Sequence, residues 1–262
     1  PGAAPATRGP AAGTPRPVPW TDDEEATRYE RGRPEYPPAL TGVLVERLSL
    51  QGGARVVDVA AGTGKLTRVL TLSPASVTAV EPRPGMRAQL HHHVPSAAVL
   101  AGIAEALPIR TGAADAVTVG QAFHWFQVDD ASHELRRVLR PGGRLAIISN
   151  QRHEPERWVK RLWSVLSDYE KIAPDSGLNR SWRAALTRTG DFGSFSRSEI
   201  ANQQRFRNLA DFDARFTSIS FVMLLDEDTR ASLIRDLRTV VADVDPIVLP
   251  LRTVVEVAVR AG

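Results

Sequence analysis

The stretch from Arg55 to Thr67 constrains the fold of this chain more than any other. It begins with a short β-branched run, passes through two alanines into a Gly-Thr-Gly turn, and continues with aliphatic residues at helical spacing. This pattern predicts a strand, a tight turn and a helix, the first half of a parallel β-α-β unit. Gly62 and Gly64 allow positive φ angles and a close approach to a ligand. Because free N–H groups at a helix start favour polar or anionic groups, the stretch is predicted to bind a nucleotide or nucleoside cofactor.

Two familiar cofactor loops fit this turn poorly. A phosphate-binding P-loop needs a glycine five residues before Gly64 and a hydroxyl residue two after it, but the chain has Val59 and Leu66 at those positions. A dinucleotide fingerprint, Gly-x-Gly-x-x-Gly, is met by the first two glycines but has Thr67 at the third place. An NAD-dependent oxidoreductase is therefore the less well supported alternative.

A third kind of loop has one acid inside the strand before the turn and a second acid at the end of the next strand. Asp58 lies four residues before Gly62, and the run Val77–Val80 ends at Glu81. This arrangement resembles the class I S-adenosylmethionine-dependent methyltransferases. Three later segments follow in the order of that superfamily: residues 102–108, 114–126 and 137–145.

A narrower resemblance comes from two further segments. Residues 31–37 read Arg-Gly-Arg-Pro-Glu-Tyr-Pro, and residues 121–126 read Gln-Ala-Phe-His-Trp-Phe. Together they resemble the small-molecule methyltransferases similar to trans-aconitate methyltransferase, with an expected place in natural product biosynthesis. The matched motifs lie within residues 28–150 of the sequence.

The resemblance implies a doubly wound α/β fold: a mostly parallel seven-stranded sheet with an antiparallel last strand and a helical cap. The hydrophobic pattern of the chain predicts strands at 55–59, 77–80, 98–100, 115–119, 144–148, within 194–206 and at 254–259. It predicts helices from about residue 22 to Pro34 and at 39–48, 84–90, 131–139, 158–172, 182–189, 209–219 and 228–244.

Composition divides the chain into a leader and one domain. Residues 1–19 are rich in Pro, Ala, Gly, Thr and Arg without periodicity, and are predicted to be a disordered leader. Residues 20–262 are predicted to form a single methyltransferase domain. Its cofactor-binding core is expected at about 40–150, its cap at 20–38 and in parts of 151–245, and its final strand at about 254–259.

The resemblance also assigns the cofactor site. The Glu81 carboxylate is expected to accept hydrogen bonds from the vicinal ribose hydroxyls, and Ala104 and Glu105 to line the adenine edge, although Glu105 is also suited to capping the turn. The N-terminal helix is expected to fold over the cofactor, and Arg33 is expected to bind the carboxylate of the cofactor. The alternative is a helix with aromatic packing in which Arg33 is solvated. The full predicted set is Tyr29, Arg33, Asp58, Ala60, Gly62, Thr63, Gly64, Glu81, Pro82, Met86, Ala104, Glu105 and Gln121.

Position 60 departs from the commoner pattern, which has glycine there. An alanine is expected to be tolerated if its φ stays negative.

The acceptor side is less well defined. His124, just after the fourth predicted strand, is the best candidate for a general base because imidazole titrates near neutral pH; the alternative is a structural role in packing that loop. His153 is the second candidate base. Tyr36, Phe123 and Trp125 are expected to form walls of the acceptor pocket, and aromatic residues are equally ordinary in a core.

Composition bounds the remaining possibilities. The chain has no cysteine, so it offers no thiolate metal site, and no apolar run approaches the roughly 20 residues that span a bilayer. Arginines are scattered among acids at a net charge of +3, which argues against nucleic-acid binding. We expect a cytoplasmic enzyme with a small-molecule acceptor, no metal, no nucleic-acid partner and no membrane partner. A non-catalytic cofactor-binding protein is the other alternative, and no sequence feature indicates an oligomeric state.

Overall fold

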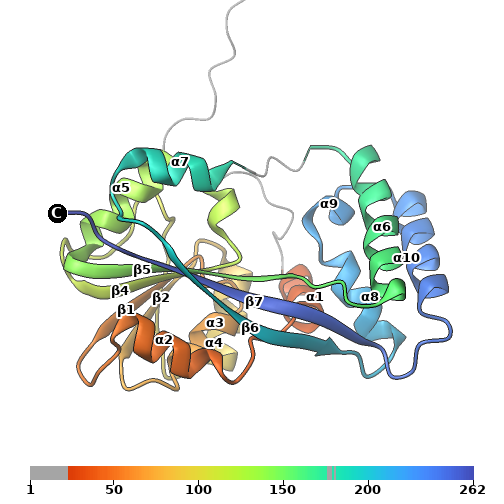
Figure 1. The fold of residues 1–262 in the computed structure, drawn as a ribbon, viewed down its shortest axis with the longest axis horizontal. Helices are drawn as coiled ribbons and strands as arrows, with labels where there is room; N and C mark the ends of the chain where they lie inside the picture. Colours follow the sequence, from red (N-terminus) through yellow and green to blue (C-terminus); the bar gives the residue numbers. More distant parts are fainter. Residues whose placement is uncertain (1–22, 176–178, 180) are drawn as a thin grey trace, which may run out of the picture.

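A single sheet of seven strands organises the molecule in the computed structural model, which describes residues 23–175, 179 and 181–262 (Figure 1). The strand order is β3-β2-β1-β4-β5-β7-β6. The strands are β1 (Arg55–Val59), β2 (Ser76–Val80), β3 (Ala98–Leu100), β4 (Ala114–Gly120), β5 (Leu139–Arg152), β6 (Ser196–Arg205) and β7 (Val248–Val259). The first five are parallel, and β7 runs antiparallel to both β5 and β6. The predicted fold class is confirmed.

Helices cover both faces of the sheet (Figure 1). On one face, α5 (Val128–Val138) and α7 (Trp182–Thr189) pack against side chains of β1, β4 and β5. On the other face, α2 (Leu40–Leu48) and α3 (Lys65–Leu70) pack against alternate residues of the same strands. The helix α4 (Pro84–His93) packs beside β2 and β3. The central strands are apolar on both faces because both faces are covered.

Three strands run past the edge of the parallel sheet. The pairing of β4 with β5 stops at Gly120 and Ile148, but β5 continues to Arg152 and pairs there with Leu251 of β7. β6 follows β7 over its whole length. The strands β5 and β7 are therefore longer than predicted, because their outer parts are stabilised by one another rather than by the parallel core.

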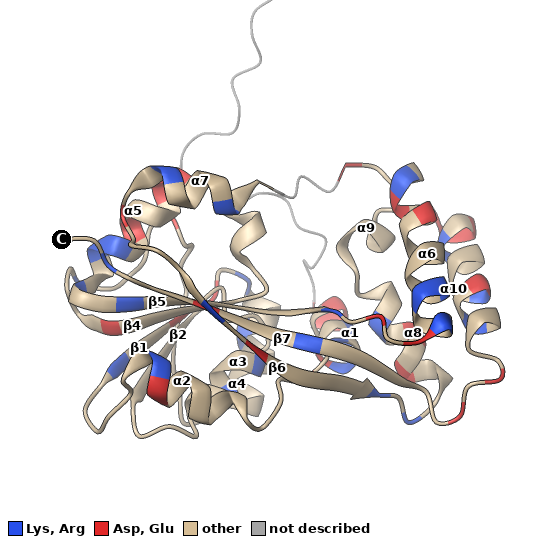
Figure 2. Ribbon diagram, viewed as in Figure 1, with Lys and Arg blue, Asp and Glu red and all other residues tan. Residues whose placement is uncertain are grey.

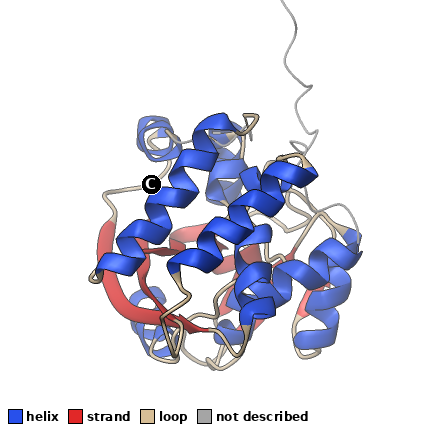
Figure 3. Cartoon of the chain, turned by 90° about the vertical axis from the view of Figure 1, so that its right-hand side faces the viewer, coloured by secondary structure: helices blue, strands red, loops and turns tan. Residues whose placement is uncertain are grey.

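A helical cap lies at the far end of these long strands (Figures 1 and 3). It consists of α6 (Arg157–Ile172), α8 (Leu209–Thr217), α9 (Ser220–Met223) and α10 (Glu227–Val240). These helices share a hydrophobic cluster of their own, which Leu249 and Leu251 of β7 join to the sheet. The short helix α9 and the 3₁₀ turn η1 (Phe123–Trp125) were not predicted, because a single turn has no readable period.

The helix α1 (Asp23–Gly32) lies between the sheet and the cap (Figure 1). Its end approaches α8 so closely that a Cβ on Gly32 would lie 2.1 Å from the carbonyl oxygen of Ala214. The Gly32 carbonyl also accepts a hydrogen bond from Gln204 of β6, at 2.8 Å. Gly32 therefore allows the end of α1 to pack closely against α8 and β6, where the cap meets the sheet.

Charged residues of both signs are interspersed over the helices (Figure 2). Several form ion pairs within the cap or between α1 and the cap, such as Arg238 with Asp213 and Arg31 with Asp211 at 2.8 Å. In the part of the chain that the structure describes, no helix is long and apolar enough to cross a membrane. The predicted leader, residues 1–19, lies outside the described residues.

Candidate cofactor and acceptor site

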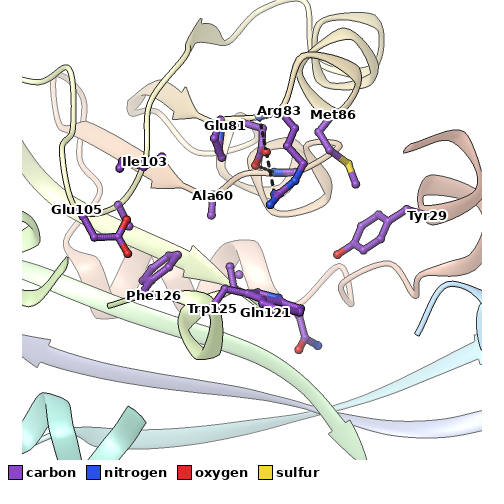
Figure 4. A pocket seen from close by; sticks show the side chains of 15 residues that line it. Tyr29, Ala60, Glu81, Arg83, Met86, Ile103, Glu105, Gln121, Trp125 and Phe126 are labelled. Carbon is purple, nitrogen blue, oxygen red and sulfur yellow. Dashed lines mark hydrogen bonds and ion pairs between the residues drawn. The ribbon is translucent and has the colours of Figure 1, made fainter. Parts of the chain in front are cut away.

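Two adjoining cavities lie at the carboxyl ends of β1, β2 and β4. The first encloses about 790 Å³ of space and the second about 680 Å³, part of which is open to solvent. They share Tyr29, Ala60, Gly62, Gly120 and Gln121 as lining residues. Figure 4 shows the first cavity, with Glu81 and Arg83 on one side and Trp125 and Gln121 opposite.

The predicted cofactor loop forms the wall between the two cavities. Gly62 has a φ of 59° and Gly64, at the start of α3, a φ of 90°. A side chain at Gly64 would also meet Val94 and Leu90 at 3.0 and 3.1 Å. Gly64 thus lies on the side of the turn that packs against α4 and the residue after it, and it lines neither cavity.

Two non-glycine residues at this wall adopt left-handed backbone angles. Ala60, directly after β1, has a φ of 54°, and Gln121, directly after β4, has a φ of 59°. The condition under which an alanine was expected to be tolerated here, a negative φ, is therefore not met. The turn requires the left-handed angle, which explains why glycine is the commoner residue there. Such angles cost a non-glycine residue about 1–2 kcal/mol, and backbone strain of this kind gathers at functional sites.

We expect Ala60→Gly to leave the free energy of unfolding unchanged or to raise it by up to about 1 kcal/mol. Relief of the left-handed alanine is partly offset by the greater entropy of glycine in the unfolded chain. The matched control is Ala116→Gly in the middle of β4, where the buried alanine has no positive φ and stability should fall by about 1 kcal/mol or more. Urea unfolding of both variants measures this, and an equal loss in both would contradict the strain assigned to Ala60.

Glu81 is a buried carboxylate at the end of β2 that faces the first cavity (Figure 4). It is 2% exposed, and its Oε2 accepts the N–H of Gly62 at 2.9 Å, while its Oε1 accepts the N–H of Arg83 at 3.0 Å. The Arg83 guanidinium lies 3.7 Å away. Burial raises the pKa of Glu81, against the lowering effect of these donors. The side chain is thus fixed in place, and each oxygen retains a lone pair for a ligand hydroxyl.

Asp58 is a second buried carboxylate, inside β1 and facing the second cavity. Its two oxygens accept hydrogen bonds from the hydroxyls of Thr67, at 2.6 Å, and Thr118, at 2.8 Å. Burial raises the pKa of Asp58 to about 6 in spite of these two bonds. The hydroxyls tie β1 to α3 and β4, so Asp58 holds the loop as well as lining the cavity.

Residues of the N-terminal segment line both cavities. The Tyr29 ring points into the first cavity from the α1 side (Figure 4). Arg33 lies over that ring, 5.1 Å from its centroid, and donates to the carbonyl of Ser218 at 2.6 Å. Burial raises the pKa of both Tyr29 and Tyr36 and lowers that of Arg33. Arg33 and Tyr36 line the second cavity.

The predicted adenine edge also lines the first cavity. Ala104 and Glu105 lie there beside Ile103 and Phe126, two apolar residues that sequence analysis did not select. The Oε1 atom of Glu105 accepts the N–H of Gln127, the residue before α5, at 2.8 Å. Glu105 therefore binds the residue that precedes α5, while its side chain remains at the cavity (Figure 4).

Most of the remaining predicted residues also line a cavity. Pro82, Met86 and Trp125 line the first cavity and Thr63 lines the second, while Gln121, which donates to the Asn150 carbonyl at 3.2 Å, lines both.

Besides Gly64, three predicted residues lie outside both cavities. Phe123 is 2% exposed and packs against Trp182 and Phe126 in the core. His124, on η1, and His153, after β5, are partly buried but are not among the lining residues of either cavity. The His124 carbonyl accepts the N–H of Asn179 at 2.8 Å. Its role as a general base stays a prediction.

Sequence analysis missed three polar residues of the second cavity, Lys65, Asn150 and Arg215. Asn150 lies two residues beyond the parallel part of β5, and its Oδ1 accepts hydrogen bonds from Thr253 at 2.5 Å and Asn202 at 3.1 Å. Its position after a buried strand was a usable signal. Arg215 belongs to α8 in the cap and carried no local signal. Among the described residues, no group of His, Asp or Glu is arranged to hold a metal ion.

Comparison with known proteins adds independent findings. A family model described as a methyltransferase domain matches residues 57–147. An uncharacterized methyltransferase-like protein of Schizosaccharomyces pombe is 30% identical over 203 residues, which cover 77% of this chain and 78% of that protein. An uncharacterized methyltransferase of Mycobacterium tuberculosis is 43% identical over 138 residues, 53% of this chain. This match spans 55%, about half, of the length of the mycobacterial relative.

Solved structures share the fold. A protein assigned as a type II methyltransferase from Anaeromyxobacter dehalogenans superposes with a TM-score of 0.64 at 24% identity, over 88% of this chain and 97% of that one. The YcgJ protein of Bacillus subtilis superposes with a TM-score of 0.56 at 16% identity, over 85% and 98% of the two chains.

Proposed function

Because this chain belongs to the class I S-adenosylmethionine-dependent methyltransferases, we propose that it transfers a methyl group from S-adenosylmethionine to a small organic acceptor. The observation that carries the proposal is the fixed Glu81 carboxylate, which faces the first cavity beside the glycine turn. That the chain belongs to the branch similar to trans-aconitate methyltransferase stays a prediction.

The residues of the first cavity fit a nucleoside. Ile103 and Phe126 offer apolar surfaces of the kind that an adenine ring packs against. Glu81 is held by the N–H groups of Gly62 and Arg83, so its remaining lone pairs can accept from two vicinal hydroxyls without further movement. Gly62 and Gln121 lie where the first cavity meets the second, and they would hold the amino-acid part of the cofactor there.

S-adenosylmethionine supplies an electrophilic methyl group on a sulfonium, ready for in-line displacement. The contribution of the chain is to hold the acceptor in line and to exclude water. Tyr29, Tyr36 and Trp125 enclose the two cavities, and Gln121 and Asn150 offer polar atoms on the acceptor side. For an acceptor that must lose a proton, we propose His124 as the base. An unchanged pH–rate profile in His124→Gln would contradict that role.

The proposal is tested by incubating the purified chain with S-adenosylmethionine and a panel of small acids, amines, phenols and activated carbon acids, and by measuring S-adenosylhomocysteine. We expect production that depends on one acceptor class and that falls at least about tenfold in Glu81→Ala at limiting cofactor. The matched control is Asp115→Ala, which removes a carboxylate that accepts a backbone N–H at the opposite edge of the sheet. Equal activity in wild type and Glu81→Ala would contradict the proposed cofactor site.

A further inference from the structure

Arg215 is a buried arginine to which the proposed reaction gives no role. It is 8% exposed and lines the second cavity. Its Nε and Nη1 atoms are buried and have no hydrogen-bond partner among the residues that the structure describes. A guanidinium stays charged at neutral pH and is costly to bury unless it is paired. An unpaired one facing a cavity therefore indicates an anionic ligand.

The fold brings a second arginine to the same place. The close approach of Gly32 to Ala214 sets the end of α1 against α8, so the residues that follow, Arg33 and Arg215, both face the second cavity. Burial, and then the neighbouring charge of Arg33, lowers the pKa of Arg215 to about 9. Two like charges held together in a cavity attract a counter-charge.

The other charged groups of this cavity already have partners. The Lys65 ammonium forms ion pairs with Glu35 and, at 3.3 Å, with Glu30. The Asp58 carboxylate accepts two hydroxyl hydrogen bonds. Neither group is therefore left to balance Arg215.

We propose that the acceptor of this methyltransferase is a carboxylate anion and that Arg215 binds its carboxylate in the second cavity. The inference rests on the proposed function and names its substrate class. S-adenosylmethionine carries one carboxylate, one ammonium and one sulfonium, so it brings a net positive charge and does not compensate the charge of Arg215. An acceptor carboxylate supplies the missing charge, and its two oxygens match the planar fork of a guanidinium.

The test uses the complex of the whole protein with S-adenosylhomocysteine and two pairs of probes: benzoate with benzamide, and glutarate with glutaramide. In calorimetric titrations, we expect at least one acid to bind about tenfold or more tightly than its amide, as for a charged hydrogen-bonded pair. Arg215→Gln should abolish that preference, and Arg215→Lys should restore part of it. The control Arg152→Gln removes an arginine that stacks on Trp163, 4.5 Å from its centroid, outside both cavities, and should keep the preference.

We expect the Arg215→Gln variant to fold, because the substitution removes a buried charge that has no partner. Its unfolding midpoint without ligand should equal or exceed that of the wild type. A preference for acids that survives in this variant overturns the inference, as does wild-type protein that binds acids no more tightly than amides.

A comparison of cofactor fragments shows whether Arg215 binds the carboxylate of the acceptor or the carboxylate of the cofactor. Arg215→Gln should bind S-adenosylhomocysteine and 5′-methylthioadenosine, which lacks the amino-acid carboxylate, as the wild type does. A tenfold loss for S-adenosylhomocysteine alone would assign Arg215 to the cofactor and overturn the inference. Wild-type protein that fails to bind S-adenosylhomocysteine at all would instead contradict the proposed function.

Discussion

Replacing Glu81 with alanine should weaken the binding of S-adenosylhomocysteine by about 1–3 kcal/mol, roughly 5- to 150-fold in Kd. The carboxylate is 2% exposed and already fixed by the N–H groups of Gly62 and Arg83, so it offers acceptor lone pairs without an ordering cost. The variant loses the ligand contacts and also leaves the N–H groups of Gly62 and Arg83 without their acceptor. Isothermal titration calorimetry measures the change.

Two controls isolate the ribose contact. Asp115 at the opposite edge of the sheet accepts the N–H of Arg55 at 2.9 Å, so Asp115→Ala should lower stability without changing affinity. On the ligand side, 5′-methylthioadenosine, which has the ribose, should lose affinity for Glu81→Ala, whereas free adenine should not. A folded Glu81→Ala variant with wild-type affinity for S-adenosylhomocysteine would show that Glu81 does not hold the ribose.

Protonation of Asp58 should make the stability of the protein depend on pH in an unusual direction. Burial raises the pKa of this acid from 3.8 to about 6 in the folded state, so the folded protein binds the proton more tightly than the unfolded chain does. The stabilisation is fully present below about pH 4 and is lost as the pH rises through about 6. A shift of this size corresponds to about 3 kcal/mol.

The comparison with Asp58→Asn isolates this effect. The stability of the wild type relative to the variant should fall by about 3 kcal/mol between about pH 4 and pH 7. Glu81, whose pKa is also raised, contributes in the same direction to both proteins, and Asp211, whose pKa is held at about 2 by Arg207 and Arg31, contributes at lower pH. The Asp211 contribution cancels in the difference, whereas the charge of Glu81, which helps to raise the pKa of Asp58, is part of the effect that the difference measures. Urea unfolding across this range that gives a pH-independent difference would refute the prediction.

The parts of the fold predicted from sequence are those with strong local signals. The strand, turn and helix around Gly62 follow from a β-branched run, two glycines and aliphatic residues at helical spacing. Glu81 could be predicted because it directly follows a buried strand, and parallel strands end at the edge where ligands bind. Such features need only neighbouring residues to identify them.

The parts that were missed depend on contacts between distant segments. The outer halves of β5 and β7 form because each pairs with the other, beyond Ile148, where the parallel sheet has ended. The φ of Ala60 is set by the turn and not by alanine's own preference. Arg215 looks like any arginine on an amphipathic helix until the packing of Gly32 against α8 buries it.

The most direct test of the central claim is a parallel calorimetric titration of the wild-type protein with S-adenosylmethionine, S-adenosylhomocysteine, NAD and ATP. The fixed Glu81 carboxylate beside the glycine turn of the first cavity predicts micromolar binding of the first two alone. Binding of NAD or ATP with equal affinity, or binding of none of the four ligands, would contradict the account.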